Sequence, residues 1–230
     1  MDLPGIAIRD YHQKNNNPAR LYVHDKFGPK VEMPVSVYFR KERQMPELEK
    51  KALQLCKGRI LDIGAGAGSH ALALQLKGKD VTALEISPAA CEVILERGVQ
   101  QVVCEDIFQF QPSGKYDTLL LLMNGIGLCG TISQLEVFLD LAEQLLNPEG
   151  VLIFDSCNIA YMYEGIGFPE YYYGEIQCRY EYRKEFTSWF KWLYIDAETM
   201  THIASSKGWD AEVILEDNRD QYLMKLTRKA

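Results

Sequence analysis

The segment Leu61-Asp-Ile-Gly-Ala-Gly-Ala-Gly68 joins the end of an apolar stretch to three closely spaced glycines. Residues 59–63 predict a short buried strand, and Ser69 begins a segment with the apolar spacing of a helix. A glycine turn after the first parallel strand lets a ligand approach the backbone, because a Cβ there would collide with it. The segment therefore predicts a ligand-binding turn between a strand and a helix.

Two common types of glycine-rich loop do not fit this turn. The dinucleotide pattern G-x-G-x-x-G requires glycine at the position of Ser69, and no Lys-Ser or Lys-Thr follows, as a nucleoside-triphosphate loop requires. Asp62 lies two residues before the first glycine, where its charge would repel a pyrophosphate. A carboxylate at that position suits a ligand that carries an ammonium group. A second interpretation is an acid that stabilises the start of a turn or helix.

Apolar strands and amphipathic helices alternate along the chain from residue 59 onward. Strands are predicted over 59–63, 80–84, 102–104, 116–122 and 151–154, and helices over 69–78, 87–98 and 131–146. Residues 211–215 and 222–227 flank a polar turn and predict a final hairpin. Continuous apolar strands separated by helices are typical of a parallel sheet covered on both faces. The pattern predicts an α/β fold: a doubly wound, mostly parallel seven-stranded sheet that ends in an antiparallel hairpin.

Two segments fall outside this alternation. Residues 1–57 have a basic balance, contain a predicted helix over 47–56 and are expected to form an N-terminal cap without a core of its own. The main domain is expected over 58–230, with an insertion over about 158–196 after the fifth strand. The insertion holds many of the chain's tyrosines, phenylalanines and tryptophans, and it predicts two added strands over 175–183 and 188–195.

Charge and composition exclude several classes of partner. The formal net charge is −7, and an acidic chain repels phosphate backbones, so no nucleic-acid partner is expected. No stretch approaches the roughly 18 apolar residues of a membrane span, and no secretory signal is present, so no membrane partner is expected. The six cysteines form no C-x-x-C pair and the four histidines form no ligand pair. These features predict reduced thiols, a cytoplasmic protein and no metal site.

The chain resembles the class I S-adenosylmethionine-dependent methyltransferases over residues 59–155, and over 211–227 by topology. In that family an acid precedes a G-x-G-x-G turn that binds the cofactor. Asp62, Gly64, Gly66 and Gly68 match this motif.

The resemblance extends to the next two strands. The family has an acid at the end of the second strand that bonds both ribose hydroxyls, and Glu85 stands there, with Ile86 beside it. It also has an acid after the third strand that accepts from the adenine amino group. Asp106 matches this acid, and Ile107 would pack on the adenine ring. Without the resemblance, Glu85 is also consistent with a solvated strand end, and Asp106 with a residue that caps a turn.

Two further residues are assigned to the cofactor site. Arg40 lies in the basic cap ahead of the first strand, where a guanidinium would hold the cofactor carboxylate, and a surface arginine is the alternative. Asn124 follows the fourth strand, where related enzymes place contacts to the substrate or cofactor.

The implied function is transfer of the methyl group of S-adenosylmethionine to a small-molecule acceptor by in-line displacement. Orientation of the nucleophile supplies much of the catalysis, and the sequence names no catalytic base. The aromatic insertion favours an organic acceptor of moderate size, or packing against another subunit in a homodimer. Three alternatives stay open: a non-catalytic cofactor-binding protein, a relative with a modified cofactor, as in aminopropyl transfer, and an NAD-dependent oxidoreductase, whose fingerprint Ser69 and Asp62 contradict.

Overall fold

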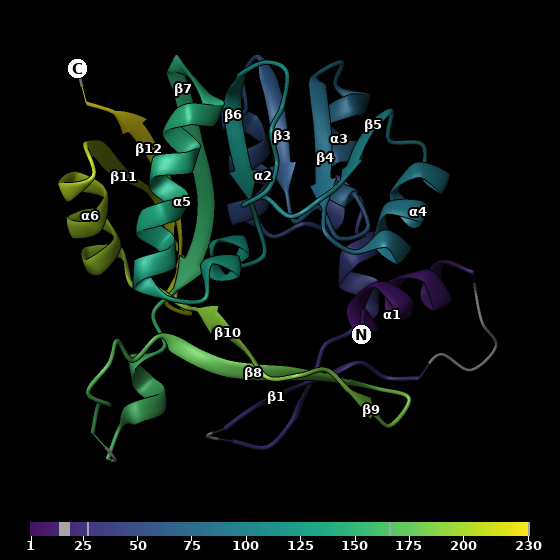
Figure 1. The fold of residues 1–230 in the computed structure, drawn as a ribbon, viewed down its shortest axis with the longest axis vertical. Helices are drawn as coiled ribbons and strands as arrows, with labels where there is room; N and C mark the ends of the chain where they lie inside the picture. Colours follow the sequence, from purple (N-terminus) through teal and green to yellow (C-terminus); the bar gives the residue numbers. More distant parts are fainter. Residues whose placement is uncertain (14–18, 27, 166, 230) are drawn as a thin grey trace. The chain divides into compact units, whose positions relative to one another are not determined.

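The computed structural model describes residues 1–13, 19–26, 28–165 and 167–229 (Figure 1). Residues 14–18 of the predicted cap, residue 27, residue 166 of the predicted insertion and the last residue lie outside the described residues. The chain forms two compact units. The first comprises Met1–Met45, Asp62–Phe110 and Gln177–Phe190, and the second comprises Pro46–Leu61, Gln111–Ile176 and Lys191–Ala230.

A seven-stranded sheet with the order β11-β12-β7-β6-β3-β4-β5 confirms the predicted fold class (Figure 1). Pairs β4–β5 and β6–β7 are parallel, whereas β12 is antiparallel to both β7 and β11. The strands are β3 (Arg59–Ile63), β4 (Asp80–Glu85), β5 (Gln101–Cys104), β6 (Tyr116–Leu121), β7 (Leu146–Cys157), β11 (Trp209–Glu216) and β12 (Gln221–Arg228). Each predicted strand of this sheet is therefore present, and the terminal hairpin is β11–β12.

Strand β7 begins earlier than the sequence predicts. The sequence predicts a helix over 131–146 and a strand over 151–154, with Asn147-Pro-Glu-Gly150 between them, but the strand already starts at Leu146. Leu146 pairs with Tyr116, and Val151 pairs with Thr118, so the register shifts between these two pairs. A bulge therefore absorbs the extra residues, because proline and glycine are tolerated where the ladder is interrupted.

The predicted helices form. They are α2 (Glu47–Leu55), α3 (Ser69–Leu76), α4 (Pro88–Glu96) and α5 (Ile132–Leu145). Side chains cap two of them, α4 and α5. The side chain of Ser87 accepts from Ala90 N at 3.0 Å, and Pro88 occupies the first helical position, as expected for the start of α4. Helix α6 (Ala197–Ser206) was not predicted, although Asp196 caps it by accepting from Thr199 N at 2.8 Å.

A second sheet has the order β10-β8-β1-β2, with β9 paired to β8. Its strands are β1 (Tyr22–Asp25), β2 (Val31–Glu32), β8 (Glu175–Tyr182), β9 (Glu185–Phe186) and β10 (Phe190–Leu193). The turn from β8 to β9 passes through Arg183 and Lys184, both with positive φ. Strands β1 and β2 were not predicted, because the few apolar residues of these short strands give no clear alternation.

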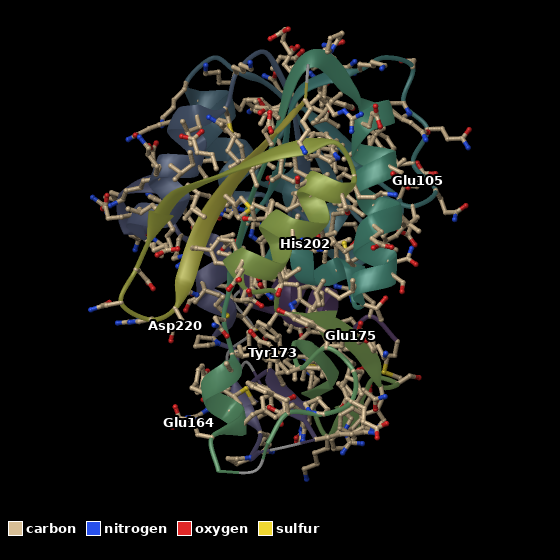
Figure 2. The ribbon with its side chains drawn as sticks, turned by 90° about the vertical axis from the view of Figure 1, so that its left-hand side faces the viewer. Glu105, Glu164, Tyr173, Glu175, His202 and Asp220 are labelled. Atoms are coloured by element: carbon tan, nitrogen blue, oxygen red, sulfur yellow. The ribbon has the colours of Figure 1, made fainter. Side chains whose placement is uncertain are left out.

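Hydrogen-bonded tyrosines precede β8 in the second unit. Tyr172 Oη donates to Asp196 Oδ2 at 2.7 Å, and Tyr173, labelled in Figure 2, donates to the same oxygen at 3.1 Å and to Asn158 Oδ1 at 2.8 Å. Tyr163 Oη donates to the carbonyl oxygen of Tyr173 at 2.8 Å. Several aromatic residues of this segment are thus fixed by polar contacts within their own unit.

Helix α1 (Leu3–His12) was also missed, and it organises the first unit (Figure 1). One side of it packs Leu3 and Ala7 against Tyr182, and another packs Ile8 against a cluster that includes Val93 of α4. Its buried Asp10 accepts from Tyr182 Oη at 2.7 Å. The N-terminal segment therefore contributes directly to the core of this unit.

The glycine at position 68 gives a stability prediction. Gly68 and Gly78 both have positive φ, but a Cβ at Gly68 would meet Ile94 Cγ2 at 3.1 Å and Val99 Cγ2 at 3.2 Å, whereas a Cβ at Gly78 meets nothing within 4 Å. We expect Gly78→Ala to lower the free energy of unfolding by about 1 kcal/mol through backbone strain alone. Gly68→Ala should cost about 1–2 kcal/mol more through overpacking. Urea denaturation of both variants checks this, and equal costs would contradict the packing argument.

Candidate cofactor site

The turn after β3 is held in a conformation that favours glycine. Gly64, Gly66 and Gly68 have φ values of +73°, +59° and +77°. The backbone N–H groups of Gly64 and Ala65 donate to the carbonyl oxygen of Leu84 at 2.9 and 3.1 Å, which ties the turn to β4. A Cβ on Gly64 would meet no atom within 4 Å, so the backbone is open to close approach at that point.

Asp62 anchors the helix that follows the turn. It lies at the end of β3 with 1 % of its surface exposed, and its Oδ2 accepts from Ala71 N in the first turn of α3 at 3.1 Å. Burial raises the pKa of this carboxyl, while His70 and the Ala71 hydrogen bond oppose the rise. This contact matches the helix-start interpretation of Asp62, and a charge there also acts on anything bound at the glycine turn.

Glu85 joins the turn after β3 to the turn after β4. Its Oε2 accepts from Gly66 N at 2.8 Å, and its Oε1 accepts from Ser87 N at 3.0 Å. Burial raises the pKa of the Glu85 carboxyl, backbone hydrogen bonds from Ser87, Gly66 and Ile86 lower it, and the nearby Asp2 raises it. A carboxylate accepts at about four lone-pair sites, so the group can still accept from a ligand hydroxyl.

Three other predicted site residues, Ile86, Asp106 and Ile107, come shortly after the ends of β4 and β5. Ile86 is 64 % exposed and Ile107 is 6 % exposed. Asp106 Oδ1 accepts from Phe108 N at 3.0 Å, so this acid does cap its own turn. Because Glu85 is the Cα partner of Cys104, Glu85 and Asp106 follow the carboxyl ends of neighbouring parallel strands.

A short helical turn, η1 (Val35–Phe39), lies against the glycine turn, and sequence reasoning missed its role. A Cβ on Gly66 would lie 3.0 Å from Tyr38 Cδ1. Ser69 Oγ donates to the carbonyl oxygen of Tyr38 at 2.6 Å. The aromatic run at 38–39, directly before Arg40, was the available signal. Arg40 itself is half-buried and ends η1, two residues after the tyrosine that faces the turn.

Arg97 was likewise missed, and it fastens η1 to the glycine turn. Its guanidinium donates to the carbonyl oxygens of Ala67 and, at 3.4 Å, of Tyr38, and it lies 4.8 Å from the centroid of the Phe39 ring. Burial lowers the pKa of Arg97. A single arginine at the end of α4 gives no recognisable pattern, so only the structure could reveal this contact.

The phenols near Glu85 stay protonated. The pKa of Tyr38 is raised by burial and further by Tyr180 and Glu85. The pKa of Tyr180 is raised to about 12, by burial first and then by Cys178 and Glu85. Both hydroxyls are therefore neutral hydrogen-bonding groups at neutral pH. Both tyrosines belong to the first unit and are close enough to Glu85 for its charge to affect their pKa.

Asn124 belongs to the second unit, whereas the other predicted site residues belong to the first. Its backbone N–H donates to Asp155 Oδ1 at 2.9 Å, its Nδ2 donates to the carbonyl oxygen of Leu193 at 3.3 Å, and its Oδ1 accepts from Ser156 Oγ at 3.0 Å. Asn124 has a positive φ of 57°. These contacts fix its side chain within that unit.

The described part of the chain carries neither a metal-binding cluster nor a membrane-spanning helix. Within it, no three or more His, Cys, Asp or Glu side chains gather in a way that could hold a metal ion. In the same residues, no helix has the length and apolar character needed to cross a membrane.

Comparisons with known proteins identify the family of the chain. A family model described as "Methyltransferase domain" matches residues 38–212. A SAM-dependent methyltransferase from Bacteroides fragilis, crystallised with S-adenosyl-L-homocysteine, is 39 % identical, with a TM-score of 0.91 over 100 % of this chain and 95 % of that chain. No curated protein matches the chain.

Two more distant structures share the fold. The CcbJ methyltransferase from Streptomyces caelestis is 13 % identical, with a TM-score of 0.63 over 85 % of this chain and 96 % of that chain. The sugar N-methyltransferase KedS8 from Streptoalloteichus is 14 % identical, with a TM-score of 0.62 over 90 % and 97 %. With the family model spanning most of the sequence and a near-complete match at 39 % identity, the chain belongs to the methyltransferase-domain family, and within it to the class I S-adenosylmethionine-dependent methyltransferases.

Proposed function

We propose that this protein transfers the methyl group of S-adenosylmethionine to a small-molecule acceptor by in-line displacement. The observation that carries the proposal is the glycine turn beside the Glu85 carboxylate, in a chain whose 39 % identical neighbour was crystallised with S-adenosyl-L-homocysteine. The cofactor would supply an electrophilic methyl group on a sulfonium. The protein then needs to bind the cofactor and the acceptor, to orient the acceptor toward the methyl group and to exclude water.

The chemistry of the turn fits the cofactor. The open backbone at Gly64 allows close approach, and the remaining lone pairs of Glu85 suit the two ribose hydroxyls. We assign the adenine to the side of Asp106, whose second carboxylate oxygen would accept from the amino group, with Ile86 and Ile107 on the faces of the ring. Ile107 is buried and would form a fixed surface for one face of the ring. Ile86 is exposed, and a bound adenine would cover it.

The methionine part of the cofactor would lie toward the glycine turn and η1. Asp62 supplies negative charge for the ammonium group while it holds the start of α3. Arg40, at the end of η1, would pair with the carboxylate. Asn124 remains a proposed contact from the second unit, at the end of β6, and residues 1–57 are proposed to act as a cap on the domain over 58–230.

The acceptor is proposed only as a small organic molecule. The relatives described as sugar or amino-pentose methyltransferases are 14–15 % identical, so they support the fold and not the acceptor. The aromatic residues of the segment over 158–196 support an organic acceptor of moderate size. A homodimer and a cytoplasmic location are part of the same proposal.

Turnover separates an enzyme from a protein that only binds the cofactor. We expect the protein to transfer radiolabelled methyl from S-adenosylmethionine into at least one compound of a deproteinised metabolite extract. Binding of S-adenosylhomocysteine without any labelled product from such extracts would favour the non-catalytic alternative. Labelled aminopropyl product in place of methyl product would favour the modified-cofactor alternative.

Glu85→Ala tests the ribose contact. We expect this variant to bind S-adenosylhomocysteine about 5- to 150-fold more weakly, because two charge-assisted hydrogen bonds are worth about 1–3 kcal/mol. Glu105→Ala is the matched control, since Glu105 (labelled in Figure 2) is an exposed glutamate one residue past the neighbouring strand. Isothermal titration calorimetry gives both affinities. Equal affinity in wild type and Glu85→Ala would remove Glu85 from the site.

The raised pKa of Glu85 predicts a pH dependence of binding. Only the carboxylate form accepts from two hydroxyls, so affinity for S-adenosylhomocysteine should fall as the pH is lowered through the raised pKa. Titrations from about pH 8 to about pH 5, where the ligand's own groups change little, should show the loss in wild type. Glu85→Gln should bind weakly and with a flat profile over the same range. An identical slope in both proteins would place the titrating group elsewhere.

A further inference from the structure

Two cysteines flank the main chain of Glu85 in the first unit. Cys91 lies in α4, and its Sγ donates to the carbonyl oxygen of Glu85 at 3.3 Å. Cys104 ends β5 and is the Cα partner of Glu85 in the parallel pair β4–β5. Because Cys91 contacts the main chain of Glu85 and Cys104 pairs with the same residue, the two thiols lie close together, and Cys104 acts on the pKa of Cys91. Two thiols from different elements thus lie at the end of β4, where Glu85 is proposed to bind the ribose.

The two thiols differ in accessibility. Among the six cysteines, all of which lie in the described residues, Cys104 is the exposed one. Cys91 is 6 % exposed, and burial and the neighbouring Cys104 raise its pKa, so it remains a protonated thiol. An oxidant from solvent therefore reacts with the exposed Cys104 first, and the buried Cys91 is the neighbouring thiol.

We propose that Cys91 and Cys104 form a modification site at which a peroxide closes the pair to a disulfide. The Cys104 thiolate attacks the peroxide, is oxidised to a sulfenic acid and releases hydroxide, which takes up a proton to become water. The Cys91 sulfur then displaces the sulfenic hydroxyl, which leaves as a second water with the thiol proton. Overall, two thiols and one hydrogen peroxide give one disulfide and two waters.

Closure of this pair changes the surroundings of Glu85. It removes the S–H donor from the Glu85 carbonyl oxygen, which also accepts from Glu105 N at 3.1 Å. A disulfide fixes the two sulfurs at bonding distance and so draws the end of β5 toward α4. Glu85 ends the neighbouring strand β4 and Asp106 follows β5, so oxidation weakens cofactor binding. This second part rests on the proposed function, whereas disulfide formation does not.

The first experiment measures the bond itself in the full-length protein. After brief treatment with hydrogen peroxide and quenching, intact mass spectrometry should show the loss of two hydrogen atoms, restored by dithiothreitol, and peptide mapping should show a Cys91–Cys104 cross-link. Cys104→Ser should abolish the cross-link. Cys157→Ser, which changes a half-buried cysteine in the second unit, should retain it. A protein with no Cys91–Cys104 cross-link, or with cross-links between other cysteines only, overturns the proposal.

The second experiment measures the consequence. The oxidised protein should bind S-adenosylhomocysteine at least about five-fold more weakly than the reduced protein, as expected when hydrogen bonds between the ligand and the Glu85 carboxylate are lost. Dithiothreitol should restore the affinity, and peroxide-treated Cys104→Ser should keep it. Equal affinities of the oxidised and reduced proteins would overturn the proposed effect on binding. Failure of the reduced protein to bind at all would instead contradict the proposed function, while the mass measurement still decides the disulfide.

Discussion

The hydrogen bonds from Gly66 and Ser87 to the two oxygens of Glu85 connect the main parts of the first unit. One carboxylate fixes the turn after β3 and the turn after β4, and the second of these turns begins α4. Bonding to charged acceptors is stronger than between neutral groups, which allows one side chain to hold two loops. The same group is the proposed ligand for a ribose, so the architecture and the binding chemistry use one set of lone pairs.

Burial makes this arrangement costly as well as useful. Burial raises the pKa of the Glu85 carboxyl against the backbone hydrogen bonds that lower it, and the nearby Asp2 adds to the rise. A ligand that adds donors to the same oxygens compensates part of that desolvation. The buried Asp62 carboxyl has a raised pKa for the same reason, although its carboxylate faces the start of α3. Two unfavourable buried acids on one glycine turn are typical of a binding site rather than of a structure optimised for stability.

The sequence predicted the elements whose signals are local. The glycine turn, the Ser87 cap and the apolar strands each have a pattern that a short window contains. The helix α1 was not predicted because its core contacts come from Tyr182 and Val93, which are far away in the chain. The role of Arg97 was not predicted because its partners are carbonyl oxygens, which every residue carries. The bulge in β7 was misread because Pro148 and Gly150 signal an interruption without saying whether it ends a strand or bends one.

For the candidate site, the sequence pointed to residue types near the ends of β3, β4 and β5, and the structure supplied their partners. Asp106 shows the difference, since the carboxylate that is proposed to accept from adenine also caps its own turn. Asn124 shows it too, because its polar groups are engaged within the second unit, which no motif could reveal.

The contacts of Arg97 have a dynamic consequence. The guanidinium holds the carbonyl oxygens of both the glycine turn and η1, and Ser69 adds a bond between the same two segments. Neither segment can separate from the other without breaking this shared set of bonds. Because these bonds are shared, we expect the glycine turn and η1 to open together and not independently of each other.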